Sequence, residues 1–247
     1  MFVEILIGFI VGILIGLTGI GGGALMMPLL LLIGIPPLIA IGTNLIFNFV
    51  TKAWSVFLHY TRKINWKIVG FLFIGIILAN FIAFFIIKSV KIIFLFYLII
   101  SILILGSLYN IIRFIMKKDR HIFYAINSSI TYIFFGFIVA LLVSLTSIGA
   151  GLILTFLLIH FTKLNEKEIV KITLIFGFLA TFFGSILHGT LGNINYKLAA
   201  LLIIGSIPGS YFGYLLHNKV DYKKLRLVLA VMILVVSFIL GIKYILT

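Results

Sequence analysis

Long apolar runs fill this chain, and their length is the strongest constraint on its fold. They lie at about residues 3–19, 23–34, 38–61, 66–87, 91–116, 123–147, 150–162, 167–190, 196–216 and 222–246. A helix of about 20 apolar residues is long enough to cross the hydrocarbon core of a bilayer. Of the 247 residues, 10% are charged, against about 25% in soluble domains. The sequence therefore predicts an all-α, polytopic membrane helix bundle surrounded by lipid.

Composition and missing motifs exclude several classes of protein. The net charge is +14, but the basic residues fall in short segments between apolar runs, as in proteins whose loops encode membrane topology, so we expect no nucleic-acid partner. The chain has no cysteine, and hence no disulfide or thiolate metal site. It contains no HExxH or GxSxG motif and no paired carboxylates inside an apolar run. We expect neither an enzyme nor a bound cofactor or metal.

The chain repeats itself. The segment GFIVGILIGLTGIGGG, from Gly8, aligns without a gap with GFIVALLVSLTSIGAG, from Gly136. The match resumes two residues out of step, where INWK from Ile64 aligns with INYK from Ile194. We interpret residues 1–116 as a first repeat, 117–122 as a basic cytoplasmic linker and 123–247 as a second repeat. Each repeat is predicted to hold a short, glycine-broken helix hairpin followed by three full spans.

The basic residues predict an orientation. If the first two runs of each repeat form a hairpin, four lysines lie on the outer side, at positions 88, 91, 197 and 243. Fourteen basic residues then lie on the cytoplasmic side, as positively charged loops prefer: Arg62, Lys63, Lys67, Arg113, Lys117, Lys118, Arg120, Lys163, Lys167, Lys171, Lys219, Lys223, Lys224 and Arg226. Each repeat then crosses an odd number of times. The repeats are therefore predicted to be inverted, in the cell membrane, with both termini on the non-cytoplasmic side.

Glycine-rich breaks interrupt the two hairpins at equivalent positions. The first break holds Gly19, Gly21, Gly22 and Gly23, and the second holds Gly149 and Gly151. Glycine lets a ligand approach the backbone closely, and the N-terminus of the helix that follows favours negative charge. The breaks therefore indicate a small-anion site shared by the repeats. The alternative is that the glycines only permit close helix packing.

The run at 38–61 carries a polar face along its whole length. On a helical wheel this face contains Asn44, Asn48, Thr51, Lys52, Ser55, His59 and Arg62. Polar residues at membrane depth usually face the bundle interior or a water-filled path. Lys52 is the one cation we place well inside the membrane, so Lys52 is a candidate ligand of the anion. The alternative is that its long side chain reaches the cytoplasmic interface.

The equivalent face of the run at 167–190 is thinner and includes Thr173 and His188. No carboxylate lies within the predicted core. His59 and His188 are therefore the candidate groups for any proton coupling. For His59, near a helix end, the alternative is an ordinary interfacial histidine.

Three segments resemble one known family. GLTGIGGGALMMPLL (from Gly16), AIGTNL (from Ala40) and HYTRKINWK (from His59) are similar to the TauE/SafE family of integral membrane proteins. The resemblance implies a transporter of sulfite, sulfoacetate or related organosulfur anions. Residues that match the family's first motif are Gly19, Gly21, Gly22, Gly23, Pro28, Thr43 and Asn44, and the second copy keeps Gly149, Gly151 and Thr173.

Together these features predict a secondary transporter of a small anion that works by alternating access. The predicted binding residues are Gly19, Gly21, Gly22, Gly23, Thr43, Asn44, Asn48, Lys52, Gly149, Gly151 and Thr173. The same residues could build a passive anion channel, and a membrane scaffold protein is a further alternative. The sequence leaves open whether the chain forms a homo-oligomer.

Overall fold

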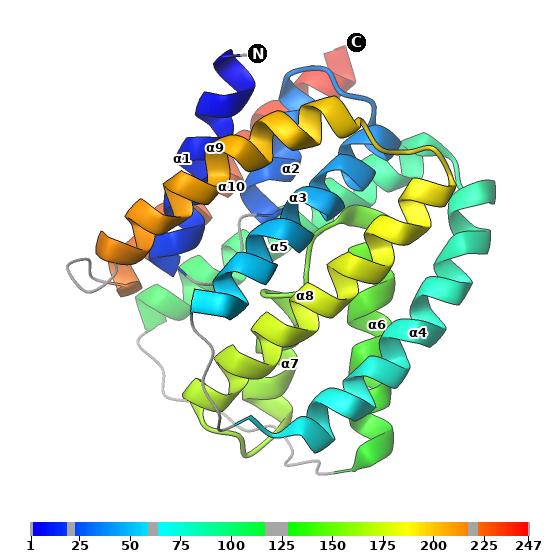
Figure 1. Cartoon of the computed structure of the whole chain (residues 1–247), viewed down its shortest axis with the longest axis vertical. Coiled ribbons are helices and arrows are strands. Elements are labelled where there is room, and N and C mark those ends of the chain that lie inside the picture. The colour runs from blue at the N-terminus through cyan, green and yellow to red at the C-terminus, as the bar shows by residue number, and fades with distance from the viewer. Residues whose placement is uncertain (1, 19–22, 59–63, 117–127, 217–221, 247) are drawn as a thin grey trace.

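The computed structural model describes residues 2–18, 23–58, 64–116, 128–216 and 222–246, which are entirely helical apart from turns and connections (Figure 1). The helices are α1 (Phe2–Thr18), α2 (Gly23–Leu32), α3 (Pro37–Leu58), α4 (Trp66–Ser89), α5 (Ile92–Met116), α6 (Ser129–Thr146), α7 (Ile153–Phe161), α8 (Glu166–Thr190), α9 (Tyr196–Leu216) and α10 (Tyr222–Leu246). The predicted all-α class is confirmed.

Helix boundaries follow from local sequence. Gly34 takes a positive φ of 85° just after α2, and Pro37, whose missing N–H costs nothing at a first helical position, begins α3. The side chain of Asn65 caps α4, and Asn165 forms a capping box with Glu168 at the start of α8. The predicted runs match the helices closely, except that α6 begins at Ser129; residues 123–127 lie outside the described residues.

Five of the described helices are long and apolar enough to cross a membrane: α4, α6, α8, α9 and the Ile92–Ile112 part of α5. Shorter apolar helices occur at Phe2–Leu17, Gly23–Leu32 and Leu227–Lys243. Two described helices remain: α7, with 9 residues, and α3, with 22 residues, which carries the polar face described above. The chain is therefore a protein with several transmembrane helices.

Helices from each half of the chain pack against helices of the other half. The first helix of each half packs along the fourth helix of the other, so that α1 lies against α9 and α6 lies against α4. The third helices, α3 and α8, contact each other, and so do the fifth helices, α5 and α10. Each of these four contacts has a counterpart when the halves are interchanged.

Glycines bring α1 and α9 into backbone contact. A Cβ on any of three α1 glycines would collide with the α9 backbone: Gly8 faces Leu202, Gly12 faces Ser206 and Gly16 faces Ser210. Because the residue numbers rise together, the helices run parallel. In the other pair, Gly75 of α4 faces the α6 backbone at Ile133 and Phe137. Small residues allow this close approach, which dispersion and backbone contacts stabilise within a membrane.

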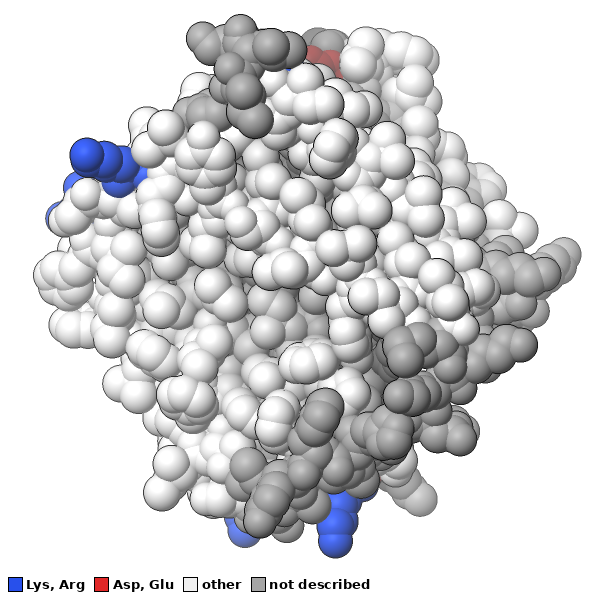
Figure 2. Space-filling model, turned by 180° about the vertical axis from the view of Figure 1, so that it is seen from behind, with Lys and Arg blue, Asp and Glu red and all other residues white. Residues whose placement is uncertain are grey.

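The outer surface fits a lipid environment. Large apolar side chains such as Phe81, Leu105 and Phe238 are at least 65% exposed. On the face in Figure 2, Lys and Arg gather at the upper left and the lower edge, acidic atoms lie at the top, and the coloured charges leave a broad white middle. In Figure 1 both chain ends lie at the top of the molecule. An uncharged belt between charged ends is what a bilayer requires of its protein.

Candidate functional site

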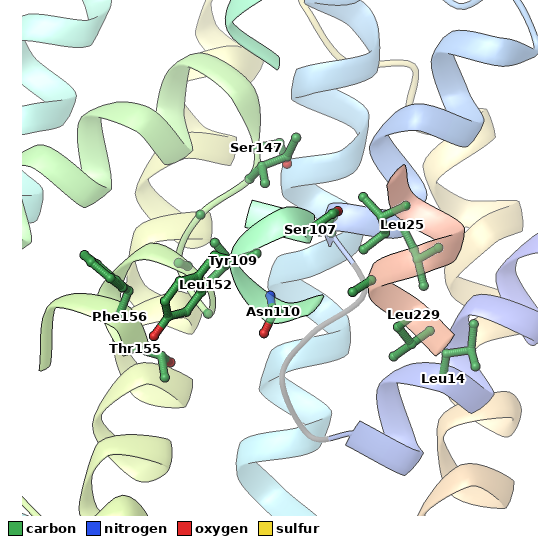
Figure 3. Close-up of a pocket in the computed structure, with 18 of the residues that line it drawn as sticks. Leu14, Leu25, Ser107, Tyr109, Asn110, Ser147, Leu152, Thr155, Phe156 and Leu229 are labelled. Atoms are coloured by element: carbon green, nitrogen blue, oxygen red, sulfur yellow. The ribbon is translucent and has the colours of Figure 1, made fainter. Parts of the chain in front are cut away.

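A cavity of about 120 Å³ lies between Gly23, at the start of α2, and the second glycine-rich break (Figure 3). Both halves of the chain contribute to its wall. The described lining residues come from α1, α2, α3, α5, α7 and α10 and from the connection between α6 and α7: Leu14, Gly23, Ala24, Leu25, Lys52, Ser107, Tyr109, Asn110, Ser147, Ile148, Gly149, Ala150, Gly151, Leu152, Thr155, Phe156, Leu229, Ala230 and Ile233. Gly23 from the first break and Gly149 and Gly151 from the second therefore border one space.

The second break has a defined backbone. Ser147 ends α6 in the left-handed region, with φ 60°, and Gly149 has φ 113°. The Thr146 hydroxyl accepts a hydrogen bond from the Ile148 N–H at 3.2 Å and so secures the turn. The Ser147 hydroxyl oxygen is buried without a hydrogen-bond partner although Ser147 lines the cavity. A buried hydroxyl without a partner is unfavourable, so Ser147 is suited to bind a ligand.

The first break is held from α3. The side-chain amide of Asn44 donates to the Gly23 carbonyl oxygen at 3.0 Å, and the Asn48 amide donates to Asn44 Oδ1 at 3.1 Å. A Cβ on Gly23 would lie 2.5 Å from Asn48 Nδ2, so only glycine fits there. Asn44 and Asn48 thus lie behind the cavity wall and position Gly23, which lines it. Gly19, Gly21 and Gly22 lie outside the described residues.

Lys52 is the one charged residue among the described residues of the cavity wall. Its side chain is only 6% exposed, so it is buried rather than extended to the interface. A Cβ on Gly177 of α8 would lie 2.8 Å from Lys52 Nζ and 3.4 Å from the Ala150 methyl, which places the ammonium beside the second break. The described carboxylates, Glu4 and Glu168, do not line the cavity.

The remaining predicted site residues lie elsewhere. Thr43 accepts a hydrogen bond from the Asn195 N–H at 3.0 Å, which ties α3 to the start of α9. Thr173 donates within its own helix to Ile169 O. Neither residue is among those that line the cavity. His59 lies outside the described residues.

His188 is fully buried. Its Nε2 lies 2.9 Å from the Ser144 carbonyl oxygen, and its Nδ1 has no hydrogen-bond partner. The Ser144 hydroxyl in turn donates to Asn80 Oδ1 at 3.0 Å. His188 therefore belongs to a polar group between α4, α6 and α8, away from the cavity.

Sequence reasoning missed the contribution of α5 and α7. Ser107, Tyr109 and Asn110 come from α5, and Thr155 and Phe156 come from α7. The Tyr109 hydroxyl is 2.9 Å from His160 Nε2, which links the two helices across the wall. The available clue was the group of polar residues at 107–110 inside an otherwise apolar run, because such residues usually face the bundle interior.

The arrangement suits an anion better than a metal. It offers the Lys52 ammonium group, the Ser147 hydroxyl and the glycines Gly23, Gly149 and Gly151. Within the described part of the chain, no three His, Asp or Glu side chains are grouped closely enough to hold a metal ion. The wall is otherwise largely apolar, as is common for small-molecule sites that use a few polar groups for orientation.

Comparisons with known proteins agree that the chain is similar to membrane transporters. A family model described as "Sulfite exporter TauE/SafE" matches residues 4–240. The chain is 34% identical over 249 residues to the "Probable membrane transporter protein YjnA" of Bacillus subtilis, covering 94% of this chain and 96% of that protein. It is 30% identical over 251 residues to a probable membrane transporter protein of Methanocaldococcus jannaschii, covering 92% and 90%. No solved structure matches the chain.

Proposed function

This chain belongs to the sulfite exporter TauE/SafE family of membrane transporters, and from that premise we propose that it carries a small anion through the cavity between its two glycine-rich breaks. Sulfite and related organosulfur anions are the substrates that the family name suggests. The proposal names the anion, its binding site and the mode of transport.

One observation carries the proposal: Lys52 is buried at the cavity wall, and no carboxylate of the described residues lines the cavity with it. An isolated charge is costly away from water unless it is paired. Within a membrane protein such a residue usually marks a substrate or ion path. A bound anion would supply the missing countercharge.

We assign distinct roles to the surrounding residues. Gly149, Gly151 and Gly23 let the anion approach the backbone, and the N-terminus of α2 adds a favourable dipole. Ser147 donates its hydroxyl. Asn44 and Asn48 act through Gly23 by holding it in place. The contributions of Gly19, Gly21, Gly22, Thr43 and Thr173 stay predictions.

For the mode of transport, we propose alternating access between inverted halves. Interchanging the halves maps α1 against α9 onto α6 against α4, and a site at the interface of two repeats is typical of such transporters. Because α1 packs on α9 and α6 packs on α4, each moving unit would contain helices from both halves. We propose that α1 moves together with α9, and that α4 moves together with α6. In this scheme both termini lie on the non-cytoplasmic side of the cell membrane.

His59 and His188 stay the candidates for proton coupling. His188 offers an unpartnered ring nitrogen in a polar group that includes Ser144 and Asn80. A His188→Gln variant should lose the part of uptake that responds to an imposed pH gradient while keeping exchange of anion for anion. If the variant loses pH-driven uptake and anion exchange equally, His188 has a structural role and does not couple protons to transport.

The test is flux through the purified full chain in liposomes. We expect saturable uptake of sulfite or ethanesulfonate that is stimulated when the same anion is loaded on the opposite side. Unitary currents without saturation would instead indicate a passive channel. If no anion in a panel of inorganic and organic oxyanions shows uptake above protein-free liposomes, the proposal fails.

A further inference from the structure

The cavity is chemically two-sided. Polar residues come from α3, α5, α7 and the second break: Lys52, Ser107, Asn110, Ser147 and Thr155. The residues from α1, α2 and α10 are apolar or glycine. In Figure 3, Leu14, Leu25 and Leu229 gather at the right, apart from Ser147, Tyr109 and Thr155 at the left and centre. The polar side also holds Ile148, Leu152 and Phe156, so a ligand meets hydrogen-bonding and apolar groups on that side and only apolar side chains or glycine on the other.

The charge of the wall limits the charge of the ligand. Lys52 is the sole charged group among the described lining residues, so it can neutralise one negative charge. A second negative charge would lose its hydration without gaining a partner, which is strongly unfavourable in a buried site. The wall therefore favours a monoanion over a dianion of similar size.

The volume limits the size of the ligand. A cavity of about 150 Å³ lined by apolar side chains accommodates benzene, which has about six non-hydrogen atoms. The cavity here is about 120 Å³, so it suits a ligand of at most about six non-hydrogen atoms by the same comparison. An anionic head with a two- or three-carbon body has this size and would place its apolar end against Leu229.

We propose that the substrate is a monovalent organic anion with a short apolar body, bound with its head at Lys52 and Ser147 and its hydrocarbon end against Leu14, Leu25 and Leu229. This inference rests on the proposed function, because it specifies the anion taken by the same site. A sulfonate or a carboxylate head meets the same requirements. Inorganic dianions and organic anions with two charged ends do not.

The experiment compares labelled anions in liposomes that contain the full chain. Ethanesulfonate and butyrate are monoanions with an apolar end, and sulfate and oxalate are dianionic counterparts that are no larger, so that ligand size does not favour the monoanions. We expect uptake of at least one monoanion to exceed that of its counterpart by about tenfold or more, as unpaired buried charge predicts, and the two monoanions distinguish the head groups. Equal or faster uptake of the dianions would overturn this inference while leaving anion transport intact. No uptake of any anion would overturn both.

A variant separates the apolar half of the site from the charge. Leu229→Ala enlarges the apolar end, so the preferred alkanesulfonate should become longer by about one or two carbons, since each added methylene needs space of its own. The matched control is Val228→Ala, on the same helix but 53% exposed, which should keep the wild-type chain-length preference. An unchanged preference in Leu229→Ala would show that the ligand does not contact the apolar wall, and the inference would fail.

Discussion

Asn44 and Gly23 connect the buried polar face of α3 to one of the glycine-rich breaks. The Asn44 amide donates to the Gly23 carbonyl oxygen at 3.0 Å, and both residues are buried. Because Gly23 is the first residue of α2, this bond sets where the short helix begins. The orientation of α2 toward the cavity therefore depends on a side chain that does not itself line the cavity.

Replacing Asn44 by leucine, the residue found at the equivalent position 174 of the second half, should weaken anion binding. The Gly23 carbonyl and the Asn48 amide would both lose a partner, and a buried unsatisfied group costs about 1–3 kcal/mol. We expect the half-saturating anion concentration to rise by about fivefold or more, since about 1.4 kcal/mol corresponds to a tenfold change. The measurement is flux against concentration in liposomes.

The control for Asn44→Leu is Thr51→Val. Thr51 is equally buried on α3, but its hydroxyl donates only to backbone carbonyls of its own helix at Phe47 and Asn48. This variant should keep near-normal transport. If the two variants transport alike, the bond to Gly23 has no role in binding.

Lys52→Met should nearly abolish anion transport without unfolding the protein. Methionine keeps much of the side-chain length but removes the charge, and loss of one partner from a buried charge pair costs about 3–5 kcal/mol. In the empty protein the same change removes a buried charge that no described carboxylate at the cavity neutralises, so the melting temperature in detergent should be unchanged or higher. Lys163→Met, at an exposed position after α7, is the control and should transport normally. Full activity of Lys52→Met would remove Lys52 from the site.

Gly149→Ala should impair transport through backbone strain at the second break. Gly149 has φ 113°, where a side chain is strained by about 1–3 kcal/mol, and its Cβ would lie 2.9 Å from Ile153 Cδ1. Gly192, with φ 72° and open space around it, is the matched control, because alanine there adds strain away from the cavity. Both variants should lower the melting temperature, but only Gly149→Ala should slow flux. Equal slowing in both would indicate a general loss of stability.

Gly205→Ala should destabilise the packing of α9 on α1. The added methyl group would collide with the Ile5 carbonyl oxygen, and overpacking of this kind costs about 1–3 kcal/mol. Melting should fall by roughly 3–10 °C, from about 2–4 °C per kcal/mol for a chain of this size. Gly70→Ala, where a Cβ would meet nothing within 4 Å, should melt like the wild type. Identical melting of the two variants would contradict the close contact.

The predicted orientation can be tested with single cysteines, because the chain has none of its own. Lys163→Cys, at the predicted cytoplasmic side, should react with a membrane-impermeant maleimide only after cells are opened. Lys91→Cys, at the predicted outer side, should react in intact cells. The reverse pattern would place the termini in the cytoplasm.

Much of the fold could be predicted because it is local. Apolar runs and their glycine, proline and asparagine boundaries define the helices, and the buried state of Asn44, Asn48, Thr51 and Lys52 follows from their shared helical face. The repeat also predicted that the two breaks correspond; of their residues, Gly23, Gly149 and Gly151 border the cavity.

Other features could not be predicted because they depend on which helices meet. Thr43 bonds to the Asn195 N–H, 152 residues away, and no local pattern indicates that partner. Ser107 and Asn110 reach the cavity because α5 passes beside it, and a polar residue within an apolar run does not show which neighbour it will face. The family resemblance supplied a class of transporter but not these contacts.

The glycine face of α1 has a consequence for how such a chain can be assembled. Gly8, Gly12 and Gly16 meet a helix encoded about 190 residues later, and α6 meets its own partner in the earlier half. A polypeptide ending at the linker would have α1 in place but nothing to cover that surface. Each half would therefore need another half as its complement, so separately synthesised halves should gain protease resistance only when they are produced together.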